Sequence, residues 1–90
     1  MMKLIVSGGD PNELAVDRYR QVLALDPQNQ QAEHGLQRVG QHYVALANAE
    51  MDRKDFDAAT AHLEKAARIL RGTNRQLYQA RQRLRSLTGG

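Results

Sequence analysis

Apolar residues recur along most of the chain at steps of three and four positions. This spacing places side chains on one face of an α-helix, because the helix makes one turn every 3.6 residues. Four such stripes follow one another between residues 13 and 87, and polar residues fill the positions between them. The pattern therefore predicts an all-α fold of about four helices that pack as antiparallel hairpins.

The first helix is predicted from clear start and stop signals. Asp10 can cap the first backbone amides, Pro11 suits the first helical position, and Glu13 can complete a capping box. The pair Asp26 and Pro27 ends the helix, since a residue that precedes proline avoids helical geometry. Its expected buried stripe is Ala15, Tyr19, Val22 and Leu23.

The second helix is predicted to be unusually long, from about Gln28 to Arg53, because no proline interrupts its apolar period. Gly35 and Gly40 lie inside it, and each costs about 1 kcal/mol relative to alanine. They indicate either a break near Gly40 or a close approach of another helix. The expected buried stripe is Ala32, Leu36, Val39, Tyr43, Leu46 and Ala47.

The third and fourth helices are also delimited by capping residues. Asp55 is the expected N-cap of the third helix, and Gly72 is the left-handed residue that ends it. Thr73 is the expected N-cap of the fourth, with Gln76 in the capping-box position. The expected stripes are Phe56, Ala59, Leu63, Ala66 and Leu70 in the third helix and Leu77, Ala80, Leu84 and Leu87 in the fourth.

The length and composition of the chain predict one small domain. Ninety residues with 41% apolar and 26% charged side chains are typical of a small globular domain. We expect a flexible or strand-like head segment over residues 1–9 and a helical domain over residues 10–88. The apolar run Leu4-Ile5-Val6 is too short for a signal peptide or a membrane span, so a cytoplasmic location is the default expectation. The chain has no cysteine, which excludes disulfides and thiolate metal sites.

Small and large residues recur with the spacing of a helical repeat. The positions that carry it are Tyr43, Leu46, Ala47, Glu50, Ala59, Leu63 and Ala66. This spacing resembles the tetratricopeptide repeat (TPR) family, with one full repeat between two half repeats at residues 15–27 and 77–84. The first helix of the full repeat is about ten residues longer than the family spacing. We expect that extension to pack on another copy, on the remainder of a larger protein, or on the head segment.

In the TPR family, the first helices of successive repeats line a concave groove that receives a peptide or a partner helix. The resemblance implies eight partner-binding residues, which are Gln41, Val44, Asn48 and Met51 in the second helix and Arg75, Tyr78, Gln82 and Arg85 in the fourth. The function it implies is a protein–protein interaction or assembly module that belongs to a larger protein. A homo-oligomerisation domain is the alternative, implied by the surplus length of the second helix.

The charge distribution raises one more class of partner. Residues 1–64 carry a net charge of −4, whereas residues 65–90 carry +7 and no acidic residue. A basic segment can attract acidic proteins or nucleic acid, so a basic adaptor for nucleic acid is a further alternative. The arginines of the fourth helix point in several directions around it, which disfavours a continuous nucleic-acid-binding stripe. They are Arg75, Arg81, Arg83 and Arg85. A membrane surface is disfavoured because the apolar stripes are needed for the core.

No motif in the sequence indicates an enzyme, a metal or a cofactor. Three histidines are scattered along the predicted helices, namely His34, His42 and His62. They lack the spacing of metal ligands with a carboxylate base. Asp52, Asp55 and Asp57 lack the alternation and the following glycine of a calcium loop, so they are expected to be capping and turn residues. We therefore expect a binding protein without a cofactor.

Overall fold

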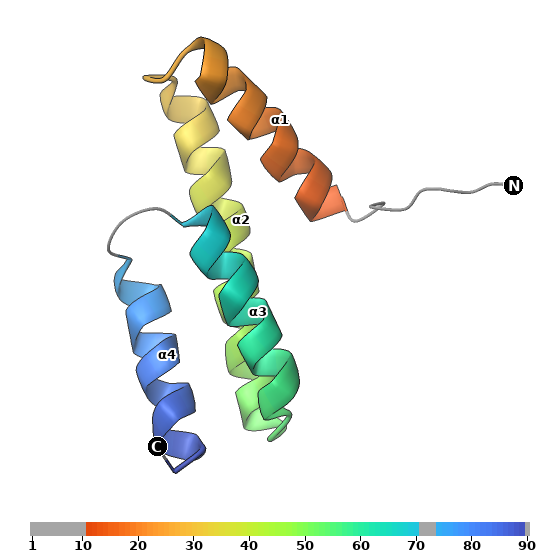
Figure 1. Ribbon diagram of the computed structural model, residues 1–90, viewed down its shortest axis with the longest axis vertical. Helices are drawn as coiled ribbons and strands as arrows, with labels where there is room; N and C mark the ends of the chain where they lie inside the picture. The colour runs from red at the N-terminus through yellow and green to blue at the C-terminus, as the bar shows by residue number, and fades with distance from the viewer. Residues whose placement is uncertain (1–10, 71–73, 90) are drawn as a thin grey trace, which may run out of the picture. The chain divides into compact units, whose positions relative to one another are not determined.

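The computed structural model describes residues 11–70 and 74–89, which form four α-helices (Figure 1). The helices are α1 (Pro11–Leu25), α2 (Gln30–Asp52), α3 (Phe56–Ile69) and α4 (Arg75–Leu87). No strand occurs within those ranges, so the predicted all-α class is confirmed. The expected head segment, residues 1–9, and the expected capping residues Asp10, Gly72 and Thr73 lie outside the described residues.

The chain divides into two compact units, residues 1–36 and residues 37–90. The first unit contains α1 and the first turns of α2. The second contains the rest of α2 together with α3 and α4. Each unit is described by itself below.

In the first unit, the turn between α1 and α2 forms where the sequence places proline and asparagine. The Asp26 backbone N–H makes the last helical bond of α1, to the Val22 carbonyl at 2.8 Å. Pro27 follows, and the Asn29 side chain then accepts a hydrogen bond from the Ala32 N–H at 2.9 Å. Asn29 thereby caps α2, which begins two residues later than the predicted Gln28.

A glycine allows α1 and the start of α2 to approach closely. A Cβ atom added to Gly35 would lie 2.2 Å from Cζ of Tyr19, so the Tyr19 ring occupies the space that a side chain at position 35 would need. Ala32 and Leu36, on the same stretch of α2, are buried. The additional turns of α2 are therefore packed on α1. This corrects the expectation that they need another copy or the head segment as a partner.

The buried side of α1 differs in part from the predicted stripe. Val16, which the prediction omitted, is buried, whereas Val22 is 39% exposed. Val16, Tyr19 and Leu23 follow one another at steps of three and four, and Val22 lies about 120° around the helix from Val16. Ala15 and Tyr19 are compatible with a buried stripe through Val22 and also with one through Val16 and Leu23. The prediction included Val22 for this reason.

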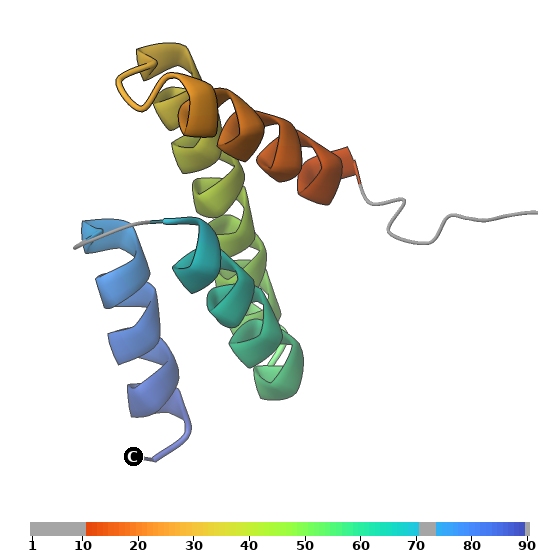
Figure 2. The ribbon, with the colours of Figure 1, turned by 45° about the horizontal axis from the view of Figure 1, so that its top comes forward.

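In the second unit, α3 runs antiparallel to the second part of α2, and α4 runs antiparallel to α3 (Figures 1 and 2). Helix α2 continues through Gly40 without a break. A Cβ atom there would lie 2.4 Å from Cγ of Leu70, so Gly40 serves the close approach of the chain that ends α3. Three alanines on the facing sides of α2 and α3 are fully buried, as predicted. They are Ala47, Ala59 and Ala66.

The link between α2 and α3 is a tight turn that ends one helix and starts the next. Lys54 adopts the left-handed conformation with φ 64°. The N–H groups of Lys54 and Asp55 donate to the carbonyls of Met51 and Glu50 at 3.0 and 2.9 Å, which is the Schellman arrangement. The Asp55 side chain then accepts from the Ala58 N–H at 3.1 Å, which confirms it as the N-cap of α3.

Helix α4 is capped by a residue that the prediction omitted. The Asn74 side chain accepts a hydrogen bond from the Leu77 N–H at 3.0 Å, so Asn74 is the N-cap. Gln76 is then the second helical residue and does not occupy the expected capping-box position. Leu77 and Ala80 are buried as predicted, while Leu87, the last residue of α4, is exposed.

Candidate functional site

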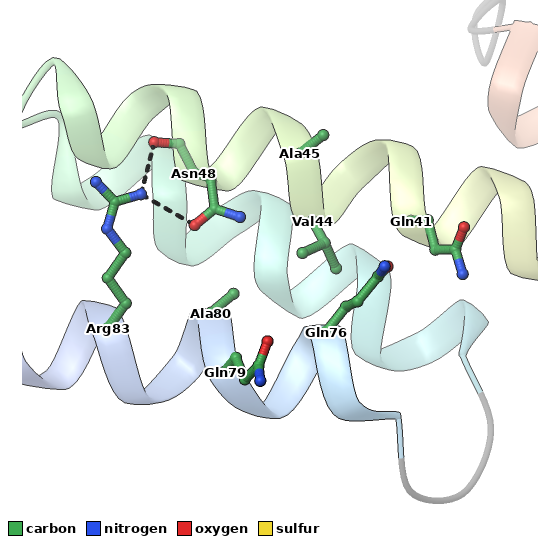
Figure 3. Close-up of a pocket in the computed structure, with 8 residues that line it drawn as sticks. All are labelled: Gln41, Val44, Ala45, Asn48, Gln76, Gln79, Ala80 and Arg83. Atoms are coloured by element: carbon green, nitrogen blue, oxygen red, sulfur yellow. Dashed lines mark hydrogen bonds between the residues drawn. The ribbon is translucent and has the colours of Figure 1, made fainter.

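A cavity of about 380 Å³ opens between α2 and α4 in the second unit (Figure 3). Each of the two helices contributes four residues to its lining. The lining residues are Gln41, Val44, Ala45 and Asn48 from α2 and Gln76, Gln79, Ala80 and Arg83 from α4.

Half of the lining consists of side-chain amides. These cavity amides are Gln41, Asn48, Gln76 and Gln79. Each carboxamide offers one acceptor oxygen and an NH₂ group with two donors. Val44 and Ala80 are buried and contribute an apolar floor. The cavity therefore combines neutral hydrogen-bonding groups with a small apolar surface, and Arg83 is the ionisable residue of its lining.

Arg83 fixes the orientation of one cavity amide. Its Nη1 donates to Oδ1 of Asn48 at 3.1 Å and to the Asn48 backbone carbonyl at 3.3 Å (Figure 3). Its Nη2 forms an ion pair with the Asp52 carboxylate. A guanidinium only donates hydrogen bonds, so the Asn48 oxygen must face it and the Asn48 nitrogen points elsewhere. That nitrogen makes no hydrogen bond with the described residues, which leaves its two donors available.

The four residues predicted from α2 have different places in the structure. Gln41, Val44 and Asn48 line the cavity together. Met51 does not line the cavity; it is 2% exposed and belongs to the core. The second part of α2 contacts both α3 and α4, so its buried arc is wider than the single stripe on which the prediction was based.

The four residues predicted from α4 all lie outside the cavity lining and are exposed. They are Arg75, Tyr78, Gln82 and Arg85. The cavity is lined instead by the next residue along the chain in three cases. Gln76 follows Arg75, Gln79 follows Tyr78, and Arg83 follows Gln82. One position corresponds to a rotation of about 100° around the helix. The prediction identified Leu77 and Ala80 as buried residues of α4 but chose the flank that does not face α2.

The aromatic and ionisable residues between α2 and α3 have a packing role. His62 stacks on the buried Tyr43, with ring centroids 6.2 Å apart, and its Nε2 lies 3.9 Å from a carboxylate oxygen of Glu50. Lys65 Nζ lies 5.4 Å from the centroid of the Tyr43 ring. Within the described ranges, no three histidine or acidic side chains are grouped as a metal site would require. None of the helices described is both long and apolar enough to span a membrane.

Comparisons of the chain with protein-family models, with curated proteins and with solved structures found no match. The TPR resemblance therefore rests on residue spacing alone, with two half repeats around the full repeat at residues 43–66, and remains a prediction. The structure adds an all-α architecture in which that spacing corresponds to one helical hairpin, α2 and α3.

Proposed function

We propose that the chain is a TPR-like protein–protein interaction module that binds an extended peptide segment of a partner in the cavity between α2 and α4. The observation that supports this function is the group of cavity amides beside the apolar residues Val44 and Ala80, with Asn48 held in one orientation by Arg83. Ligand sites commonly combine apolar area with a few oriented polar groups.

Carboxamides suit an extended peptide because each peptide unit presents one N–H donor and one C=O acceptor. An extended segment that enters the cavity loses the water molecules bound to its N–H and C=O groups. The carboxamide donors and acceptors on both helices can replace those hydrogen bonds. The available Asn48 nitrogen would donate to a peptide carbonyl. The floor formed by Val44 and Ala80 would receive one small apolar side chain.

The cavity is suited to an uncharged segment of the peptide. Asp52 forms an ion pair with Arg83, which offsets the one positive charge of the lining. A carboxylate ligand would have to compete with Asp52 for the same guanidinium. We therefore propose that the cavity recognises the backbone in the middle of a peptide and not a free C-terminal carboxylate.

The test begins with selection of peptides from a random phage-displayed library against the 90-residue chain. The affinity of a selected, fluorescently labelled peptide is then measured by anisotropy. We expect Asn48→Ala and Gln79→Ala each to weaken binding by about 3- to 10-fold, because each removes one or two net hydrogen bonds. Gln37→Ala is the matched control, since Gln37 is an exposed glutamine of α2 outside the cavity lining.

Two results would contradict this function. In one, selection enriches no peptide above background. In the other, Asn48→Ala and Gln79→Ala bind the selected peptide as tightly as the wild type, with unchanged helical circular dichroism. The second result would place the peptide on another surface.

Self-association is a second candidate, favoured by an apolar strip on α1. Leu14, Val22 and Leu25 are exposed, Leu25 by 90%. These three side chains lie within an arc of about 80° around the helix. Sedimentation over a concentration series tests this candidate: an assembly that Leu25→Lys disrupts supports it, and a single species of 10.1 kDa at every concentration excludes it.

A further inference from the structure

One side of α4 presents arginines and an aromatic ring to solvent. We call it the basic face, formed by Arg75, Tyr78, Arg81 and Arg85. At about 100° per residue, these four positions fall within an arc of about 120°. All four residues are exposed, and Tyr78 keeps 61% of its surface accessible. At about 1.5 Å per residue, the face extends roughly 15 Å along the helix.

The charges of the basic face are not compensated within the part of the chain that is described. Arg83 is the arginine of α4 that forms an ion pair, and it does so on the other flank, with Asp52. Arg75, Arg81 and Arg85 make no ion pair or hydrogen bond with the described residues. Helix α4 also contains no aspartate or glutamate. Three guanidinium groups on one side of the helix are therefore available to an anionic partner.

We propose that the basic face binds single-stranded nucleic acid, with the three guanidinium groups on phosphates and the Tyr78 ring stacked on a base. The sequence pattern disfavoured this partner because the four arginines of α4 point in several directions. In the structure, the arginine that points away, Arg83, is held by α2. The other three share one side with the exposed ring.

The exposed ring favours a single strand over a duplex. Bases in a single strand present faces on which an aromatic side chain can stack, whereas in a duplex those faces are covered by neighbouring bases. The arginines favour a phosphate chain over an acidic protein segment. Exposed arginine–carboxylate pairs add little net free energy, whereas each arginine that neutralises a phosphate releases a condensed counterion.

The basic face is separate from the cavity. The cavity residues of α4 are Gln76, Gln79, Ala80 and Arg83. Ala80 belongs to the buried stripe, and the other three lie on the flank of that stripe opposite to the basic face. A ligand on one flank therefore leaves the other accessible. Nucleic-acid binding and peptide binding therefore depend on different residues. A negative result for one proposal leaves the other to be tested by its own experiment.

The experiment measures the affinity of the chain for a fluorescein-labelled oligo(dT) of about 15 nucleotides by anisotropy between about 50 and 200 mM NaCl. Three phosphate contacts give a slope of log K against log [salt] of about −2, which is roughly a 20-fold loss over this range. We expect Arg81→Gln/Arg85→Gln to weaken binding at the lowest salt concentration by at least about 10-fold and to reduce the slope to about −0.7, the value for one remaining contact.

Two further variants distinguish the phosphate contacts of the arginines from base stacking and from net charge. Tyr78→Ala is expected to weaken binding by about 5-fold or more without a change in slope, because the ring carries no charge. Arg18→Gln/Arg38→Gln removes the same net charge from exposed positions on α1 and α2, and is expected to bind as the wild type does. Helical circular dichroism of every variant verifies that it is folded.

Any of three results would overturn the proposal. The first is no salt-dependent binding of oligo(dT). The second is an equal loss for the Arg18/Arg38 control, which would indicate attraction to net charge alone. The third is binding of duplex DNA or polyglutamate as tight as that of oligo(dT), with Tyr78→Ala unchanged, which would identify the face as a general site for polyanions or acidic proteins.

Discussion

Replacement of Gly40 by alanine has two opposing effects on stability: it raises helix propensity, and it introduces a steric clash. Alanine in a helix interior is about 1 kcal/mol more favourable than glycine. A Cβ atom at this position would lie 2.4 and 2.5 Å from Cγ and Cδ2 of Leu70. Leu70 is only 5% exposed and cannot swing into solvent. Overpacking a core costs about 1 to 3 kcal/mol, so we expect Gly40→Ala to destabilise the protein by about 1 kcal/mol.

Removal of the Leu70 side chain should reverse the sign of this effect. Leu70→Ala alone is expected to cost about 2 to 5 kcal/mol, because it leaves a cavity in the core. In that background the methyl group introduced at position 40 no longer meets a neighbour and fills part of the space. Gly40→Ala should then stabilise the protein by about 1 kcal/mol, which gives a coupling of about 2 kcal/mol between the two positions.

The assay is urea unfolding followed by helical circular dichroism for the wild type, both single variants and the double variant. Thermal unfolding provides a second readout, since a change of about 1 kcal/mol shifts the Tm of a domain of this size by about 4 to 8 °C. If Gly40→Ala stabilised the wild type and the Leu70→Ala variant by the same amount, the close approach of Gly40 and Leu70 would be refuted.

Three further substitutions test individual elements of the fold. Met51→Ala should destabilise the protein by about 2 to 5 kcal/mol in urea unfolding, because Met51 is a core residue. A loss below about 1 kcal/mol would contradict its burial. Lys54→Gly should stabilise by about 1 kcal/mol in a thermal melt, since glycine adopts positive φ without strain, and a destabilised variant would contradict the left-handed turn. Asn74→Ala should destabilise by about 1 kcal/mol by removing the cap on the Leu77 N–H, whereas an unchanged urea midpoint would argue against that cap.

The helices could be predicted from the sequence because their signals are local. The apolar period identified all four helices, and Pro27 and Asp55 marked boundaries that the structure confirms. The close approach at Gly35 and Gly40 was one of two predicted possibilities, and only the tertiary structure decides between them. A glycine within a helix looks the same in the sequence whether it breaks the helix or contacts a neighbour.

The candidate site was predicted less well because it depends on which helices are neighbours. On α2, the periodic stripe does not reveal that Val44 and Met51 are also covered. On α4, the stripe through Leu77 and Ala80 has two flanks, and the sequence does not specify which one faces α2. A signal was present for Arg83, since Asp52 and Asn48 are four residues apart and so share a side of α2, but recognising the pair requires the two helices to be placed.

The most direct test of peptide binding in the cavity is a ¹⁵N NMR titration that follows side-chain amide signals as a selected peptide is added. Each cavity amide gives its own NH₂ signals, and we expect these signals to shift together as the cavity fills. The side-chain signals of Gln37 and Gln82, which lie outside the lining, should remain in place. Shifts at Gln82 with no change at the cavity amides would contradict the account.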